Sequence, residues 1–148
     1  MHALSAIGRF HGLEHHFGLR VYFEDTDLTG VVYHANYLRY MERARSDMLL
    51  AVGVDQRTTF ESGDGAYALR SIQLDYRAPA RLGEELIVVS RLMAMRAAAV
   101  VIQQRVMRDE TIVAQGEVEA AFVSPTGRPR RQPAAWIAAF EPLLWKGS

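Results

Sequence analysis

Acidic side chains, a glycine and a histidine lie close together near the start of the chain. The acids are Glu24, Asp25 and Asp27, and Gly30 and His34 follow them. A carboxylate can act as a general base or as a nucleophile, and the free backbone N–H groups of a helix start can polarise a carbonyl. A glycine permits a close backbone approach or a positive φ angle. This combination is sufficient, in principle, for acyl transfer to water.

The three acids are not equivalent. Asp25 and Asp27 alternate at the end of an expected strand, so their side chains should face opposite ways, and only one should be catalytic. We expect Asp25 to be structural, capping the turn or pairing with an arginine, and Glu24 to be solvated. On spacing alone, turn capping is the commoner role for Asp27 as well.

A strand and a helix are expected to position this stretch. Residues 17–24 carry aromatic and β-branched side chains typical of a strand. Residues 35–52 change to a helical period, and Gly53 is a plausible helix stop. Leu38, Leu49 and Leu50 widen the apolar arc of this helix. Its expected buried face consists of Tyr37, Met41, Ala44, Met48 and Val52.

The rest of the chain indicates an α+β protein. Four more strands are expected, at residues 71–78, 85–92, 98–108 and 111–124, with a turn at Asp109–Glu110, a loop at 58–65 and a short helix at 134–144. No linker divides the 148 residues, so we expect one domain, with a weakly ordered segment at 1–16 and a C-terminal extension at 130–148. One helix cannot cover both faces of such a sheet, which predicts a homo-oligomer.

Composition narrows the classes of function. The 17 basic and 17 acidic residues cancel, so there is no basic footprint for nucleic acid. The absence of cysteine excludes a thiol nucleophile and Cys-based zinc sites. No signal peptide and no apolar run long enough to span a bilayer is recognisable, so a cytoplasmic, non-transmembrane protein is expected.

Two stretches resemble a known family. DLTGVVYHANY at residues 27–37 closely resembles the signature of hotdog-fold acyl-CoA thioesterases of the 4-hydroxybenzoyl-CoA thioesterase superfamily. With EDTD at 24–27 and MERARSDML at 41–49, the chain is most similar to the branch associated with the Tol-Pal system, which LDYRAPARLG at 74–83 also resembles. The resemblance spans roughly residues 21–129. It implies a hotdog fold, in which a five-stranded antiparallel sheet wraps one long central helix, with active sites at a dimer interface, frequent tetramers and no metal or other cofactor.

The resemblance also implies roles for individual residues. The catalytic carboxylate is the second acid of the Asp-x-Asp pair, which is Asp27. The backbone N–H of His34 is expected to polarise the thioester carbonyl, and the imidazole is implicated in this branch. The remaining expected substrate contacts are Tyr22, Gly30, Tyr33 and Asn36.

Several of these residues, and others, have structural interpretations. Asn36 is equally well explained as a helix N-cap, and Tyr37 as a core residue. The pair His15–His16 lacks acidic or cysteine partners at ligand spacing, so we expect a surface or disordered pair rather than a metal site. For the basic cluster Arg128, Arg130 and Arg131, a solvated tail is favoured over contact with CoA phosphates.

Hydrolysis of acyl-CoA to free acid and CoA is therefore the predicted activity, with acyl carrier protein as an alternative carrier. Asp27 would act as a general base or as a nucleophile, and the sequence does not separate these routes. A second hypothesis is a non-catalytic acyl-binding or scaffold protein of an envelope or lipid-synthesis complex. A dehydratase of the same fold is disfavoured, because it expects a different arrangement of His and Glu.

Overall fold

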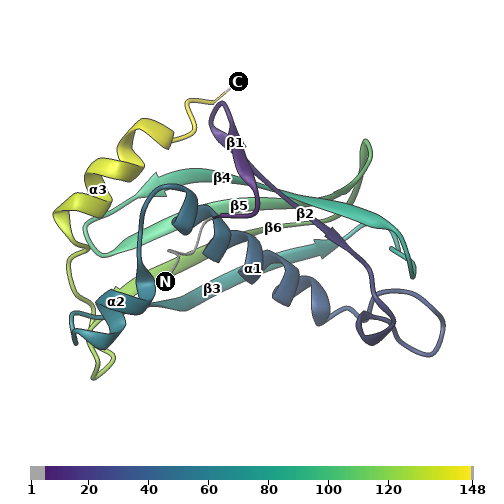
Figure 1. Ribbon diagram of the computed structural model, residues 1–148, viewed down its shortest axis with the longest axis horizontal. Coiled ribbons are helices and arrows are strands. Elements are labelled where there is room, and N and C mark those ends of the chain that lie inside the picture. Colours follow the sequence, from purple (N-terminus) through teal and green to yellow (C-terminus); the bar gives the residue numbers. More distant parts are fainter. Residues whose placement is uncertain (1–5, 148) are drawn as a thin grey trace.

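One long helix packs on one antiparallel sheet in the computed structural model, which describes residues 6–147 (Figure 1). The sheet has the order β1-β2-β4-β5-β6-β3, and all neighbouring strands are antiparallel. The strands are β1 (Arg9–His11), β2 (Glu14–Arg20), β3 (Ala66–Tyr76), β4 (Glu85–Met95), β5 (Ala99–Arg108) and β6 (Thr111–Val123). The helices are α1 (Asn36–Ala51), α2 (Gln56–Glu61) and α3 (Ala134–Phe140), with 3-10 turns η1 (Phe23–Asp25) and η2 (Glu141–Leu143). The predicted α+β architecture is confirmed.

The N-terminal part differs from the prediction. The sheet has six strands rather than five, because residues 9–11 form β1 and pair with β2. The expected weakly ordered segment therefore contains strand residues, although residues 1–5 of it lie outside the described part of the chain. The strand predicted at 17–24 instead runs over 14–20, since residues 23–25 turn into η1.

The burial of a polar residue explains why the predicted strand began three residues after the true start of β2. His15 is fully buried, and its Nε2 lies 3.0 Å from Oδ2 of Asp47 on α1. Asp47 also accepts hydrogen bonds from the backbone N–H groups of Ile7 (2.6 Å) and Gly8 (2.8 Å). A histidine that is buried through such a partner breaks the apolar alternation by which a strand is recognised. The expectation of a surface or disordered His15–His16 pair was wrong for His15.

Two other segments were only partly predicted. The expected loop at 58–65 begins as α2, because the Asp55 side chain accepts hydrogen bonds from the Thr58 N–H (3.1 Å) and hydroxyl (2.7 Å) and caps the helix. β3 also begins five residues earlier than predicted and ends two residues earlier, at Tyr76. The hairpin at Asp109–Glu110 is confirmed, and Asp109 takes the positive φ (51°) that a glycine would more often supply.

Helix α1 buries the predicted face except for Val52, which follows the helix and is half-buried. Tyr37, Met41, Ala44 and Met48 are buried, whereas Leu38 and Leu50, which were expected to widen that face, are exposed. The helix ends at Ala51, and the predicted stop residue Gly53 follows two residues later with a φ of +84°. Sixteen helical residues make α1 about 24 Å long, enough to run along most of the sheet.

The core consists of two clusters along α1. The first surrounds the helix start and includes Tyr37, Tyr40 and Met41. The second surrounds its C-terminal half and includes Met48 and Leu49, together with Trp136 and Phe140 of α3. Figure 1 shows α2 and α3 at this second end, and the connection from β2 to α1 at the opposite end. The predicted C-terminal helix is therefore part of the core.

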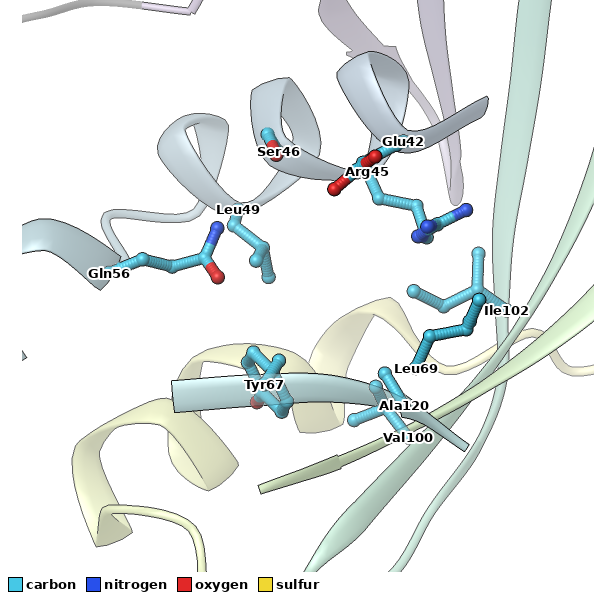
Figure 2. A pocket seen from close by; sticks show the side chains of 10 residues that line it. All are labelled: Glu42, Arg45, Ser46, Leu49, Gln56, Tyr67, Leu69, Val100, Ile102 and Ala120. Carbon is cyan, nitrogen blue, oxygen red and sulfur yellow. The ribbon is translucent and has the colours of Figure 1, made fainter. Parts of the chain in front are cut away.

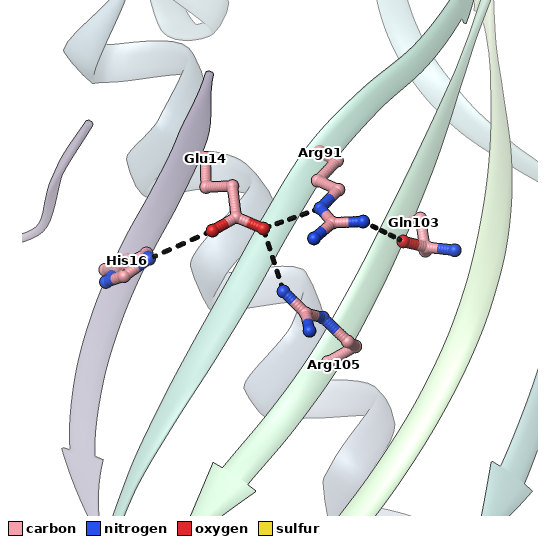
Figure 3. Close-up of polar contacts among 5 residues, drawn as sticks. All are labelled: Glu14, His16, Arg91, Gln103 and Arg105. Carbon is pink, nitrogen blue, oxygen red and sulfur yellow. Dashed lines mark hydrogen bonds and ion pairs between the residues drawn. The ribbon is translucent and has the colours of Figure 1, made fainter. Parts of the chain in front are cut away.

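A network of charged side chains lies on the face of the sheet away from α1. Glu14 on β2 accepts hydrogen bonds from Arg91 on β4 (2.6 Å) and Arg105 on β5 (2.8 Å), and so links three strands (Figure 3). The guanidinium of Arg91 also lies 3.9 Å from the centre of the Trp145 ring. This network ties β2, β4 and β5 together on the outer face. Within residues 6–147, no helix is both long and apolar enough to cross a membrane.

Candidate active site

The segment that carries Asp27 is a tight loop between η1 and α1. A four-residue turn runs from Asp27 to Gly30, where the Gly30 N–H donates to the Asp27 carbonyl at 3.2 Å. The Asp27 N–H in turn donates to Val31 at 2.8 Å. Gly30 has a φ of +80°, so it supplies the left-handed conformation that the sequence analysis anticipated.

The connection from β3 to β4 holds this loop in place. Ala80 accepts a hydrogen bond from the Val32 N–H (2.8 Å), and the Leu82 N–H donates to Gly30 (3.2 Å). Ala80 is completely buried. The two stretches that carried the family resemblance, about fifty residues apart in sequence, therefore lie against each other and form one unit.

Asp27 combines a turn-capping contact with an accessible carboxylate. Its Oδ1 accepts hydrogen bonds from the Thr29 hydroxyl (2.6 Å) and the Thr29 N–H (2.8 Å). These bonds favour the charged form, and the hydroxyl contributes most to holding the pKa of the Asp27 carboxyl below its usual value. Within residues 6–147, Oδ2 has no hydrogen-bond donor, so it can face a substrate or a water molecule.

Asp25 has the structural role that was expected. It is buried, and its carboxylate accepts a hydrogen bond from the Tyr22 N–H at 2.8 Å across the η1 turn. Its backbone carbonyl accepts bonds from the Tyr33 N–H (2.9 Å) and from Nδ2 of Asn36 (2.8 Å). Asp25 and Asp27 differ in exposure as predicted. The cause is a turn and not strand alternation.

Two consecutive backbone amides are left free just before α1. The Tyr33 N–H bonds to Asp25, and the Asn36 N–H bonds to the Tyr33 carbonyl at 2.8 Å. Between them, the N–H groups of His34 and Ala35 have no acceptor among the described residues. Free amides at a helix start are suited to bind an oxyanion. This pair lies a few residues beyond Asp27.

The other predicted site residues differ in exposure and in their contacts. Tyr22 and Tyr33 are exposed beside the loop. Asn36 is not the N-cap, which is Ala35, and its Nδ2 donates to the Asp25 carbonyl and so ties the helix start to Asp25. The imidazole of His34 is exposed and lies 4.4 Å, centre to centre, from the Tyr33 ring.

Tyr76 is a residue of this site that sequence reasoning did not single out. It is the last residue of β3, and its hydroxyl donates to the His34 carbonyl at 3.0 Å. Its ring also packs edge-on against His34 and Tyr37. Tyr76 stands in the second stretch that resembles the family, but nothing in the local sequence indicates that it reaches the helix start.

A pocket lies further along α1, between the helix and the inner face of the sheet (Figure 2). Its volume is about 110 Å³. Leu49 points into it from the helix, and Leu69 and Ile102 line it from the sheet. Arg45 stands at its edge, and Nη1 of Arg45 donates to Oε1 of buried Gln104 at 3.0 Å. The pocket is mostly apolar, so it suits an alkyl or aryl group.

The basic cluster near the C-terminus does not reach Asp27 or the start of α1. Arg128, Arg130 and Arg131 are exposed, and the Arg130 guanidinium donates to the Asp64 carbonyl at 2.6 Å. Asp64 follows α2, which lies at the opposite end of the sheet in Figure 1. Within one chain, Arg130 is therefore engaged in holding the loop after α2.

Comparisons with known proteins converge on one family. A model of the thioesterase-like superfamily matches residues 21–140. The chain is 34% identical over 125 residues to the acyl-CoA thioesterase YbgC of Haemophilus influenzae, covering 81% of this chain and 92% of that protein. It is 37% identical to an acyl-CoA thioester hydrolase YbgC of Escherichia coli, covering 83% and 92%. A crystal structure of a probable thioesterase from Bartonella henselae superposes with a TM-score of 0.76 at 33% identity, covering 81% of this chain and 99% of the other. The hotdog fold is thereby confirmed.

Replacing Thr29 with valine tests the electrostatics of the loop. The variant keeps the β-branched shape and the backbone N–H but loses the hydroxyl bond to Oδ1, which stabilises the charged carboxylate. The pKa of Asp27 should therefore rise in Thr29→Val. A ¹³C NMR titration of the Asp27 carboxyl measures it.

Thr26→Val is the matched control. It removes a hydroxyl that donates to the Phe23 carbonyl at 2.7 Å rather than to a carboxylate, so the Asp27 titration should not move. An unchanged titration in Thr29→Val would show that the backbone bond alone accounts for the lowered pKa.

Proposed function

The chain belongs to the thioesterase-like superfamily and is a thioester hydrolase, and from this premise we propose that it hydrolyses acyl-CoA at Asp27 and the start of α1. The observation that carries the proposal is the combination of an accessible carboxylate with two free backbone amides on one loop. The matched relatives are named acyl-CoA thioesterases or thioester hydrolases, which supports CoA as the carrier.

In the general-base route, Oδ2 of Asp27 takes a proton from water while the water oxygen attacks the thioester carbonyl carbon. Negative charge develops on the carbonyl oxygen, and the N–H groups of His34 and Ala35 stabilise it. The carbon–sulfur bond then breaks, the acid is released, and the proton on Asp27 passes to the CoA thiolate. The low pKa of Asp27 keeps the base ionised before attack.

In the nucleophilic route, Oδ2 itself attacks the carbonyl carbon and displaces the thiolate, giving a mixed anhydride that water then hydrolyses. Both routes need the same carboxylate and the same oxyanion donors. Hydrolysis in ¹⁸O-labelled water separates them, because only the anhydride route can transfer an aspartate oxygen to the released acid in a single turnover.

The pocket under α1 is the proposed place for the distal part of the acyl group. Arg45 lies nine residues after Asn36, which corresponds to about 13 Å along the helix. An acyl chain that starts at His34 and follows α1 would reach Leu49, Leu69 and Ala120 only if it is extended. We therefore propose that long linear acyl groups are preferred over acetyl.

A dimer would complete this path. β3 is an edge strand of eleven residues, and one side of it is unpaired among the described residues. Leu69, the fourth residue of this strand, and Tyr76, its last, are exposed in the single chain although they border the pocket and the helix start. A long exposed edge of this kind is normally covered. We propose that a second copy pairs along β3 and encloses both.

Replacing Asp27 with asparagine tests the catalytic assignment. The variant keeps the shape of the side chain but can neither accept a proton nor attack, so thiol release should fall by about 10²-fold or more. The assay follows free thiol over a panel of short, long and aryl acyl-CoAs, with acyl carrier protein substrates beside them.

Glu24→Gln is the matched control, because it removes a neighbouring exposed carboxylate and should leave the rate unchanged. His34→Ala removes the imidazole but keeps the backbone amide, so it should retain more activity than Asp27→Asn. Equal rates for Asp27→Asn and the native protein would remove Asp27 from the mechanism. Binding of acyl-CoA without thiol release would favour a non-catalytic binder.

Filling the pocket tests the acyl path. Ala120→Phe should lower kcat/KM for long acyl-CoAs by roughly 10-fold or more relative to acetyl-CoA, because the pocket can no longer hold the distal carbons. Ala121→Phe places the same ring one residue later, on the opposite face of β6. It should leave the ratio unchanged. If both variants lowered the ratio of kcat/KM for long acyl-CoAs to that for acetyl-CoA equally, the acyl group would not lie in this pocket.

Light scattering tests the proposed dimer. The native protein should have at least twice the mass of one chain. Leu69→Asp, which adds a charge to the exposed edge, should shift it toward the monomer with lower activity. A fully active monomer would contradict a shared site.

A further inference from the structure

We infer that Tyr76 is a positioning residue that aims the Ala35 amide at the reacting carbonyl. The inference rests on the proposed hydrolysis and adds to it a residue from a different part of the chain. Tyr76 ends β3, 42 residues beyond the carbonyl that it holds.

The first step concerns the carbonyl of His34. In a regular helix this carbonyl would accept the N–H of Leu38, four residues later. Here the Leu38 N–H donates to Ala35 at 3.2 Å, and within residues 6–147 no backbone N–H donates to the His34 carbonyl. The Tyr76 hydroxyl takes this place at 3.0 Å.

The second step follows from the planar peptide. The His34 carbonyl and the Ala35 N–H belong to the same trans peptide unit and point in opposite directions. A hydrogen bond that fixes the carbonyl therefore fixes the amide. Tyr76 lies on one side of this unit, so the Ala35 N–H is directed to the other side, where it remains without a partner in the described structure.

The neighbouring peptide unit shows the same principle with a different holder. The His34 N–H shares its unit with the Tyr33 carbonyl, which accepts the Asn36 N–H at 2.8 Å. The helix itself therefore orients the His34 amide, and Tyr76 orients the Ala35 amide. Each of these two N–H groups is therefore oriented by a hydrogen bond to the carbonyl of its own peptide unit.

The Tyr76 ring is half exposed in the single chain, but it packs edge-on against two neighbouring rings. Its ring centre lies 5.7 Å from that of buried Tyr37 and 6.1 Å from that of His34, both edge-on. The hydroxyl has no charged partner among the described residues and donates only to His34. Preorganised donors are effective because they need no rearrangement during the reaction.

Tyr76→Phe tests the inference, since it removes the hydroxyl and keeps the ring. We expect kcat to fall about 10- to 100-fold, with KM within about 2-fold and the acid limb of the pH–rate profile unmoved. In ¹⁵N-labelled protein, the Ala35 amide resonance should shift or broaden. The thermal unfolding midpoint, measured alongside, identifies any loss of fold.

Thr26→Val is again the control, because it removes a hydroxyl-to-carbonyl bond in the same loop but away from the helix start. It should preserve both kcat and the Ala35 resonance. The inference would be overturned if Tyr76→Phe had the native kcat, whether or not its KM changed. An unmoved Ala35 resonance in a folded variant would do so even if activity fell.

The outcome is separable from that of the proposed function. If the native protein releases no thiol from any acyl thioester, the hydrolysis itself fails. If the native protein is active and Asp27→Asn is not, while Tyr76→Phe remains fully active, only the role of Tyr76 fails.

Discussion

The burial of α1 against the sheet is the constraint on which the other features depend. Met41 and Ala44 are completely buried, and Tyr37 and Met48 nearly so. Complete burial of one large apolar side chain contributes about 1.5–3 kcal/mol, whereas a hydrogen bond contributes about 0.5–1.5 kcal/mol net. Packing therefore decides where the helix lies. The hydrogen bonds of its first turn then decide how its free amides are oriented.

Asp27 illustrates how a turn cap and the proposed catalytic carboxylate can share one side chain. Capping of the turn uses Oδ1 alone and holds the carboxylate in its charged form. The second oxygen stays available. The structural and the chemical interpretations of Asp27, which the sequence set against each other, are compatible because each needs only one oxygen.

The helix, its buried face and the β5–β6 hairpin could be predicted from sequence, because each depends on residues that are close together in the chain. The start of β2 could not, since His15 is buried only through Asp47, 32 residues away. The same limit applied to Tyr76, whose contact with His34 spans 42 residues. The motif located Asp27 and the helix start, but the residues that orient them are revealed only by the tertiary structure.

The two core clusters along α1 divide the molecule into separate halves. The first cluster supports the loop of Asp27 and the helix start, whereas the second, with α3, forms the surroundings of the pocket. Substitutions in the second half can therefore reshape the pocket without moving the carboxylate or the amides. If the pocket holds the acyl group, as we propose, substrate range can diverge during evolution while the proposed catalytic carboxylate and amides are inherited unchanged.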